Sequence, residues 1–232
     1  MKHLGIFGGT FNPIHFGHLR VAVDVLEKFE LDTIIFIPSA QPPHKSYSNI
    51  ANAFDRLKMT QLAIHSYPLF ECSNIETKRQ GVSYTIETIQ EMRILHPGNV
   101  QFYYLIGIDA FFAIHTWKSF EKLFDIIPFI VMSRPEISNH SMLANNTNLI
   151  DYIQQTISRE YQHSEQNKRM IHPSKQPVYY CQVTALDISS SKIRTYLKKG
   201  QSIQYLLPDY VHKYIIENKI YQTRTSYDQK RS

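Results

Sequence analysis

The sequence predicts an α/β protein with a doubly wound, largely parallel sheet. Apolar runs at residues 33–37, 100–107 and 129–132 have the composition of strands that are covered on both faces. Segments with helical spacing separate these runs, and such alternation is typical of parallel sheets. With 232 residues, 43% of them apolar, the chain can bury one full core. We expect one domain over residues 1–222 and a flexible tail at 223–232.

The first element is a short apolar strand that ends at Gly8 and Gly9, followed by a loop that contains Pro13. Glycine has no Cβ, so the backbone there can take φ > 0 and let an anion approach its N–H groups. An amphipathic helix begins near Gly17, and its positive N-terminal end points toward whatever lies over the glycines. This segment predicts a phosphate site, whereas a glycine pair taken alone indicates only a tight turn.

Two histidines, His15 and His18, stand where this helix begins. At an i, i+3 separation they can face the same point if the first turn is formed. Imidazole donates hydrogen bonds and can carry charge, so the pair could stabilise phosphoryl oxygens. The alternatives are surface histidines or one half of an incidental metal site.

Residues 33–37 form the second strand and complete a βαβ unit. The segment 39–46 contains Pro42 and Pro43, which exclude regular structure. It follows the carboxyl end of a strand, where open α/β sheets bind ligands. Lys45 is therefore either a triphosphate contact or a solvated loop lysine.

A helical stripe over residues 50–64 and a short strand at 69–72 come next. Ser83 is placed to cap the third helix. After the strand at 100–107, Asp109 could accept hydrogen bonds from ribose hydroxyls or could be the N-cap of a helix over 110–117.

Residues 136–176 are rich in Asn, Ser, Gln and His, and we expect a surface insertion there with one weak helical pattern at 149–157. A strand at 178–183 follows. The serines at 189–191, with Gly200 beyond, indicate a short capped helix. Its N-terminus, together with Arg194, could form a second anion site.

The net charge of +5 fits anionic ligands, and the lysines and arginines are scattered. Scattered charge favours small phosphorylated substrates over a nucleic acid. No signal peptide or membrane-spanning run is evident, so we expect a cytoplasmic protein. Cys72 and Cys181 each fall in a predicted strand, which argues against a disulfide framework and a zinc site.

The pattern Gly-Gly-Thr-Phe-Asn-Pro-Ile-His-x-Gly-His at residues 8–18 resembles the signature of the class I nucleotidylyltransferase superfamily. Further motifs resemble the bacterial nicotinate mononucleotide adenylyltransferases in order and spacing. These are Pro-Pro-His-Lys at 42–45, Ser-Tyr-Thr at 83–85, Gly-x-Asp at 107–109, Trp117, and Ile-Ser-Ser-Ser-x-Ile-Arg at 188–194.

The resemblance implies a Rossmann-like nucleotidylyltransferase fold that transfers the adenylyl group of ATP to nicotinate mononucleotide, in NAD biosynthesis. The implied catalytic residues are His15, His18, Lys45 and Arg194. The implied ATP-binding residues are Gly8, Gly9, Thr10, Phe11, His15, His18, Lys45, Gly107, Asp109, Ser190 and Arg194. The implied nicotinate-nucleotide residues are Tyr84, Thr85 and Trp117.

Spacing alone would place Trp117 in the core, and the resemblance reverses that interpretation. One departure is Asn12, where many bacterial members have Asp. Because no carboxylate cluster is evident, we expect Mg²⁺ to be bound mainly through substrate phosphates, with no protein metal site.

Three alternatives remain. A sister nucleotidylyltransferase would use nicotinamide mononucleotide, phosphopantetheine or a cytidylyl substrate. A non-enzymatic nucleotide- or RNA-binding module would show steep salt dependence. A dehydrogenase would need the Gly-x-Gly-x-x-Gly fingerprint, which the sequence lacks. The sequence leaves the oligomeric state open.

Overall fold

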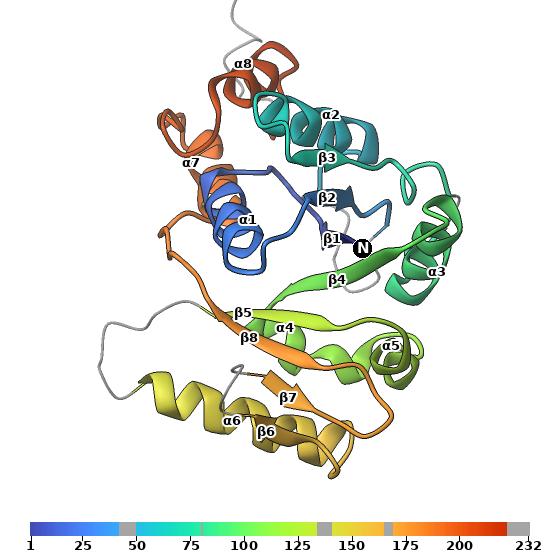
Figure 1. Ribbon diagram of the computed structural model, residues 1–232. Coiled ribbons are helices and arrows are strands. Elements are labelled where there is room, and N and C mark those ends of the chain that lie inside the picture. Colours follow the sequence, from blue (N-terminus) through green and yellow to red (C-terminus); the bar gives the residue numbers. More distant parts are fainter. Residues whose placement is uncertain (42–49, 80, 134–140, 165–168, 222–232) are drawn as a thin grey trace, which may run out of the picture.

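The protein is built on an eight-stranded sheet with helices on both faces, as the computed structural model shows (Figure 1). The structure describes residues 1–41, 50–79, 81–133, 141–164 and 169–221, and of residues 141–147 the backbone alone. In order across the sheet, the strands are β3 (Phe70–Cys72), β2 (Thr33–Pro38), β1 (Lys2–Gly9), β4 (Val100–Gly107), β5 (Phe129–Ser133), β8 (Val178–Gln182), β7 (Arg169–Ile171) and β6 (Gln162–Ser164).

The first six strands in that order are parallel to one another, and β7 and β6 continue the sheet antiparallel. The chain leaves β1 toward β2 and β3, then returns to place β4 on the other side of β1. The carboxyl ends of β1 and β4 therefore lie side by side at the point where the strand order reverses. Open α/β sheets bind their ligands at such a switch point. The predicted doubly wound α/β class is confirmed.

Helices cover the sheet in two layers, each with its own apolar core (Figure 1). One layer contains α1 (Phe16–Lys28), α2 (Ala53–Ile64), α7 (Ser190–Lys198) and α8 (Asp209–Glu217). The other contains α3 (Thr85–Leu95), α4 (Ile108–Phe112), α5 (Phe120–Ile126) and α6 (Ser141–Thr156). Successive strand residues alternate between the layers: Phe36 packs in the first and Ile35 in the second. Coverage of both faces explains why these strands are continuously apolar.

The predicted cap of the third helix is wrong, and of the two alternatives left open for Asp109 the N-cap is excluded. The N-cap of α3 is Tyr84, and the hydroxyl of Ser83 instead accepts a hydrogen bond from the N–H of Ala40 at 3.1 Å. The N-cap of α4 is Gly107, so Asp109 lies in the first turn rather than at the cap. This helix ends at Phe112, and a separate 3₁₀ helix follows at Ile114–Thr116.

The predicted cap of α7 is confirmed. Ser189 is its N-cap, and the serine side chain accepts a hydrogen bond from the N–H of Lys192 at 3.2 Å. Gly200, just past the helix, has the left-handed φ of 67° that favours glycine. Both cysteines lie in strands, Cys72 in β3 and Cys181 in β8, and both are free thiols.

The segment 136–176 contributes more to the sheet than its composition indicated. It contains the expected helix, α6, but also β6 and β7, which the sequence analysis missed. Leu149, Ile153, Tyr161 and Met170 are fully buried in the second core. The described part of this segment is therefore packed onto the same sheet as the rest of the chain.

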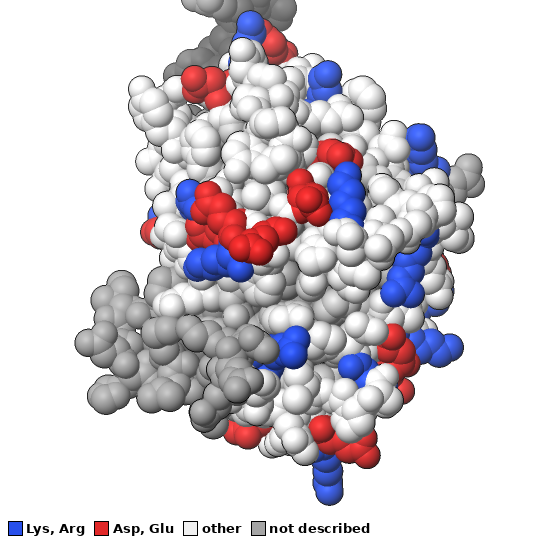
Figure 2. Space-filling model, in the orientation of Figure 1, with Lys and Arg blue, Asp and Glu red and all other residues white. Residues whose placement is uncertain are grey.

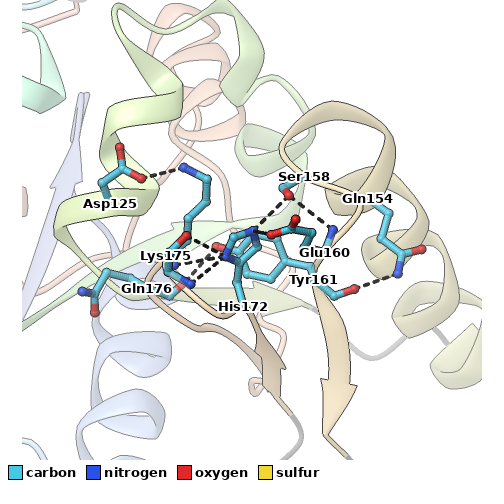
Figure 3. Close-up of polar contacts among 9 residues, drawn as sticks. Asp125, Gln154, Ser158, Glu160, Tyr161, His172, Lys175 and Gln176 are labelled. Carbon is cyan, nitrogen blue, oxygen red and sulfur yellow. Dashed lines mark hydrogen bonds and ion pairs between the residues drawn. The ribbon is translucent and has the colours of Figure 1, made fainter.

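A histidine in a polar network joins the turn before β6 to the turn after β7 (Figure 3). The Nδ1 of His172 accepts from the backbone N–H groups of Ser174 and Lys175, each at 3.1 Å. Its Nε2 lies 2.9 Å from the Ser158 hydroxyl and 3.4 Å from a Glu160 carboxylate oxygen. Because backbone N–H groups can only donate, the hydrogen of the neutral ring is on Nε2 and points toward Ser158. This histidine cannot deprotonate that serine, so the cluster is structural despite its serine, histidine and glutamate.

Charges are mixed on the surface. Figure 2 shows basic and acidic side chains interspersed among the described residues of the face that it draws. Within the described residues, no helix has the length and apolar content needed to cross a membrane.

Candidate functional site

The two glycines at the end of β1 leave room for neighbouring side chains. A Cβ on Gly8 would lie 2.6 Å from the Oη of Tyr104, and a Cβ on Gly9 would lie 2.9 Å from Cζ of Phe11. Among the described residues, the left-handed glycines are at 81, 98 and 200, so neither of this pair has positive φ. The positive φ expected here falls on Phe11, at 45°. Glycine is therefore required by close approach and not by the backbone angle.

Arg56 of α2 fixes the loop that follows the glycines. It is 1% exposed. Its guanidinium donates to the carbonyls of Thr10 at 2.8 Å, Ala40 at 2.9 Å and Ala51 at 2.9 Å. Burial lowers the pKa of this group from its usual range. One buried cation thus joins the loop after β1, the loop after β2 and the start of α2.

Two side chains of α7 donate hydrogen bonds to the same loop, a few residues further along the chain. The Ser190 hydroxyl donates to the carbonyl of Pro13 at 2.8 Å, and Nη1 of Arg194 donates to the carbonyl of Asn12 at 2.7 Å. Both predicted anion ligands therefore lie against the loop backbone. Since C=O and N–H point in opposite directions across a trans peptide, the N–H of Ile14 faces away from Ser190.

The two histidines stack at the start of α1. His15 is its N-cap, and the ring centroids of His15 and His18 are 3.8 Å apart with an interplanar angle of 34°. The Nδ1 of His18 accepts from the backbone N–H of His15 at 3.3 Å. The hydrogen of a neutral His18 ring is then on Nε2, which can donate to an anion. The Phe11 ring meets His18 edge-on at 5.2 Å.

A cavity of about 520 Å³ opens beside the glycines. Its size is that of a small-molecule site. The residues around it come from β1, the loop after β2, the start of α3 and the segment after α4; they are Gly8, Gly9, Thr10, Ser39, Glu76, Ser83, Tyr84, Thr85, Tyr104, Ala110, Thr116, Trp117 and Lys118. The structure thus brings three predicted ATP residues and all three predicted nicotinate-nucleotide residues around one space.

One end of the cavity is aromatic. Trp117 is half-buried and packs edge-on against Tyr104, with ring centroids 6.1 Å apart. The Nζ of Lys118 lies 4.3 Å above the ring of Tyr84 and 2.7 Å from a Glu87 carboxylate oxygen. These contacts fix the aromatic rings and leave the partly exposed tryptophan at the cavity wall.

A buried acid, Glu76, also lines the cavity. It is 7% exposed and accepts a hydrogen bond from the Thr88 hydroxyl at 2.8 Å. Burial raises the pKa of this carboxyl, and hydrogen bonds from Thr88, Ser83 and the N–H of Ala40 oppose that rise. The carboxyl therefore ties the wall made by Ser83 to the loop after β2.

The remaining predicted residues that the structure describes do not line the cavity. Five of them lie in the loop after β1, at the start of α1 and in α7: Phe11, His15, His18, Ser190 and Arg194. Gly107 and Asp109 are exposed at the carboxyl end of β4 and do not line the cavity. Lys45 lies outside the described residues. Within the described part of the chain, no group of three or more His, Cys, Asp or Glu side chains could hold a metal ion.

The sequence analysis missed two buried polar residues of this region, Arg56 and Glu76, and the partly buried Tyr221. A signal existed for Arg56, because the buried residues of α2 are at 56, 59, 60, 63 and 64, so the arginine falls on the buried stripe. The hydroxyl of Tyr221 donates to Oδ1 of Asn12 at 2.7 Å. We find no sequence pattern that indicates that contact or the burial of Glu76.

Comparisons with known proteins agree on one family. Residues 6–196 match the sequence model of the cytidylyltransferase-like family. A probable nicotinate-nucleotide adenylyltransferase of Geotalea daltonii is 40% identical over 218 residues, which are 94% of this chain and 97% of that protein. A protein with the same description from Desulfatibacillum aliphaticivorans is 40% identical over 220 residues, covering 94% and 99% of the two chains.

Solved structures share the fold. The nicotinic acid mononucleotide adenylyltransferase of Plasmodium falciparum, complexed with NaAD, has a TM-score of 0.67 at 21% identity, covering 95% of this chain and 98% of that one. A putative nicotinate-nucleotide adenylyltransferase from Vibrio parahaemolyticus has a TM-score of 0.59 at 17% identity, covering 95% and 96%.

Proposed function

The chain belongs to the cytidylyltransferase-like family and transfers the adenylyl group of ATP to nicotinate mononucleotide, and we propose that the cavity beside Gly9 seats the two substrates. The products are nicotinate adenine dinucleotide and pyrophosphate, and the reaction is a step of NAD biosynthesis. The observation that carries the site assignment is the continuous cavity wall from Gly8 and Gly9 to Trp117. One end suits phosphate, and the other suits a flat aromatic ring.

Gly8, Gly9 and Thr10 line the phosphate end of the cavity, and His15, His18 and Arg194 are not part of that lining. We propose that these three side chains supply hydrogen-bond donors to the α-phosphate of ATP. His15 and His18 lie at the N-terminus of α1, where the helix dipole also favours an anion. Arg194 uses Nη1 on the loop and Nη2 on the Ser191 hydroxyl at 3.2 Å, so its Nε and the remaining guanidinium hydrogens can face the triphosphate. Lys45 is proposed to contact the leaving pyrophosphate, and Gly107 and Asp109 to contact ribose.

The aromatic end seats the nicotinate ring on Trp117. Helix α3 begins at Thr85, and no side chain caps its N-terminus. Tyr84 and Thr85 line the cavity, so the N-terminus of α3, with its first N–H groups, lies at the cavity wall. A helix N-terminus favours a carboxylate, which nicotinate carries and nicotinamide lacks.

The mechanism follows from charge and alignment. The 5′-phosphate of nicotinate mononucleotide has a second pKa near ~6, so it is mostly dianionic at neutral pH and needs no general base. It attacks the α-phosphorus in line, the new P–O bond forms, and pyrophosphate leaves with the electrons of the broken P–O bond. The protein aligns the two phosphates and stabilises the charge that develops on the phosphoryl oxygens. We assign that role to His15, His18 and the N-terminus of α1.

A divalent metal fits this site if the substrate phosphates serve as its ligands. The described residues offer no carboxylate cluster, so Mg²⁺ would be bound mainly by the phosphate oxygens of ATP and would neutralise part of their charge.

The test is product formation with purified protein. ATP is supplied with nicotinate mononucleotide, nicotinamide mononucleotide or phosphopantetheine; pyrophosphate release is followed, and the dinucleotide is identified by mass spectrometry. We expect nicotinate mononucleotide to be the preferred acceptor. If pyrophosphate is released with ATP and phosphopantetheine but with neither pyridine nucleotide, the assignment of the aromatic end is rejected.

A further inference from the structure

The C-terminal segment reaches the loop that precedes α1. Tyr221 follows α8, and its hydroxyl donates to Oδ1 of Asn12 at 2.7 Å. Lys219 and Tyr221 both have left-handed φ, 51° and 66°, which is uncommon for residues with a Cβ. Helix α8 itself packs against α2 (Figure 1). The turn after α8 therefore brings one phenol to a loop more than 200 residues earlier in the chain.

Asn12 is the residue through which this contact acts. It is 5% exposed, and its Oδ1 accepts a second hydrogen bond, from the N–H of Ala51 at 2.9 Å. Its backbone carbonyl accepts from Arg194 at 2.7 Å. A single side chain oxygen thus joins the loop to the start of α2 and to the C-terminal segment. This arrangement gives Asn12 a role as an acceptor, which a carboxylate at the same position could also fill.

The hydroxyl of Tyr221 can be removed by substitution without loss of the packing of its ring. The ring packs against the first apolar core, so a phenylalanine would keep that packing. When the Tyr221 hydroxyl is absent, Oδ1 of Asn12 still accepts a hydrogen bond from the N–H of Ala51, so this buried acceptor keeps a donor. Loss of the hydroxyl should therefore cost little folding stability while loosening the loop on one side.

We propose that Tyr221 is a positioning residue for adenylyl transfer, because its hydroxyl holds Asn12 and thereby fixes the loop 10–15 in the conformation that aligns the α-phosphate. This inference rests on the function proposed above. Tyr221 lines no part of the cavity and acts only through Asn12. Misplacement of a positioned phosphate by a fraction of an ångström is enough to slow an in-line displacement.

The test compares Tyr221→Phe with a matched control. Tyr214→Phe removes a phenol hydroxyl of α8 that donates to Asp55 at 2.8 Å and does not touch the loop. We expect Tyr221→Phe to lower kcat/KM for ATP by about three- to tenfold, as for one hydrogen bond. Tyr214→Phe should retain the wild-type value, and the melting temperatures of the two variants should agree. Wild-type kinetics in Tyr221→Phe would overturn the proposal.

A double-mutant cycle asks whether the effect passes through Asn12. Asn12→Ala removes the acceptor, so adding Tyr221→Phe to it should change kcat/KM no further. If the two losses multiply instead, Tyr221 does not act through Asn12. Asn12→Asp keeps an acceptor for both donors and should restore at least most of the activity lost in Asn12→Ala; an equal loss in both variants would also overturn the proposal.

Binding separates this inference from the function on which it rests. The affinity of each variant for ATP is measured by calorimetry alongside turnover. If the wild-type protein binds ATP but forms no dinucleotide, the proposed function fails, whereas weaker ATP binding by Tyr221→Phe than by Tyr214→Phe would still support loop positioning. Equal ATP affinity and equal turnover in these two variants would exclude it.

Discussion

Replacing Gly9 by alanine adds one methyl group at the end of β1, against the ring of Phe11. The new Cβ would lie 2.9, 3.0 and 3.2 Å from Cζ, Cε1 and Cε2 of Phe11. Non-bonded carbons pack at about 3.5–4.0 Å, so the ring must move. Phe11 is 2% exposed and touches the rings of Phe7 at 5.5 Å, Phe36 at 5.7 Å and His18 at 5.2 Å. The ring cannot move without displacing one of them.

The magnitude follows from this confinement. Overpacking of a filled core costs about 1–3 kcal/mol. For a domain of this size, each kcal/mol lowers the melting temperature by about 2–4 °C, so Gly9→Ala should melt about 2–12 °C below the wild type. If the displacement reaches His18, a shift of about 1 Å at the phosphate would lower kcat by about 10²-fold.

Gly107→Ala is the matched control for stability. No atom lies within 4 Å of a Cβ built there, and φ is −69°, which alanine accepts. Differential scanning calorimetry should therefore show a large decrease in melting temperature for Gly9→Ala and almost none for Gly107→Ala. Equal melting temperatures would refute the packing argument. In that case Phe11 would have room that the structure does not show.

Three further outcomes are expected. His18→Ala should lower kcat by at least ~10²-fold while changing ATP affinity modestly, because it removes a donor used in the transition state; near-normal turnover would exclude His18 from the chemistry. Trp117→Ala should raise KM for nicotinate mononucleotide about tenfold or more, as for loss of a stacking platform, and leave KM for ATP unchanged; a change confined to ATP would move the ring elsewhere. Burial raises the pKa of the Cys72 thiol to about 12 and that of Cys181 to about 11. Since the thiolate fraction is very small at pH 8, iodoacetamide should label the native protein slowly and the urea-unfolded protein fast; equal rates would contradict this burial.

The strands were the most predictable part of the fold. The apolar runs at residues 33–37, 100–107 and 129–132 were confirmed as β2, β4 and β5, because a parallel strand covered on both faces has little room for polar residues. Strands β6 and β7 were missed, because each has only three residues and β6 reads Gln-His-Ser. Such short strands at one side of the sheet are defined by their pairing, which the sequence does not display.

Local signals failed where a distant partner decided the outcome. Ser83 has the composition of a helix cap, but its hydroxyl accepts from Ala40, 43 residues earlier in the chain. The cap of α7 was predictable because Ser189 and its partner Lys192 are three residues apart. A capping signal is therefore reliable when no other donor competes for the hydroxyl, and that condition is set by tertiary structure.

The same distinction applies to the site. The glycines and the two histidines are a continuous motif, so the sequence could place them together. The groups that hold the loop come from far away: Arg56 from α2, Arg194 from α7, and Tyr221 from the turn after α8. Each donates a hydrogen bond to a carbonyl or amide oxygen of the loop. The motif therefore identifies the residues of the loop, whereas some of the hydrogen bonds that hold the loop come from elements far away in the sequence. The phosphate site proposed at this loop would therefore depend on residues as far along the chain as Arg194 and Tyr221, and the motifs that resemble the family likewise extend from residue 8 to residue 194.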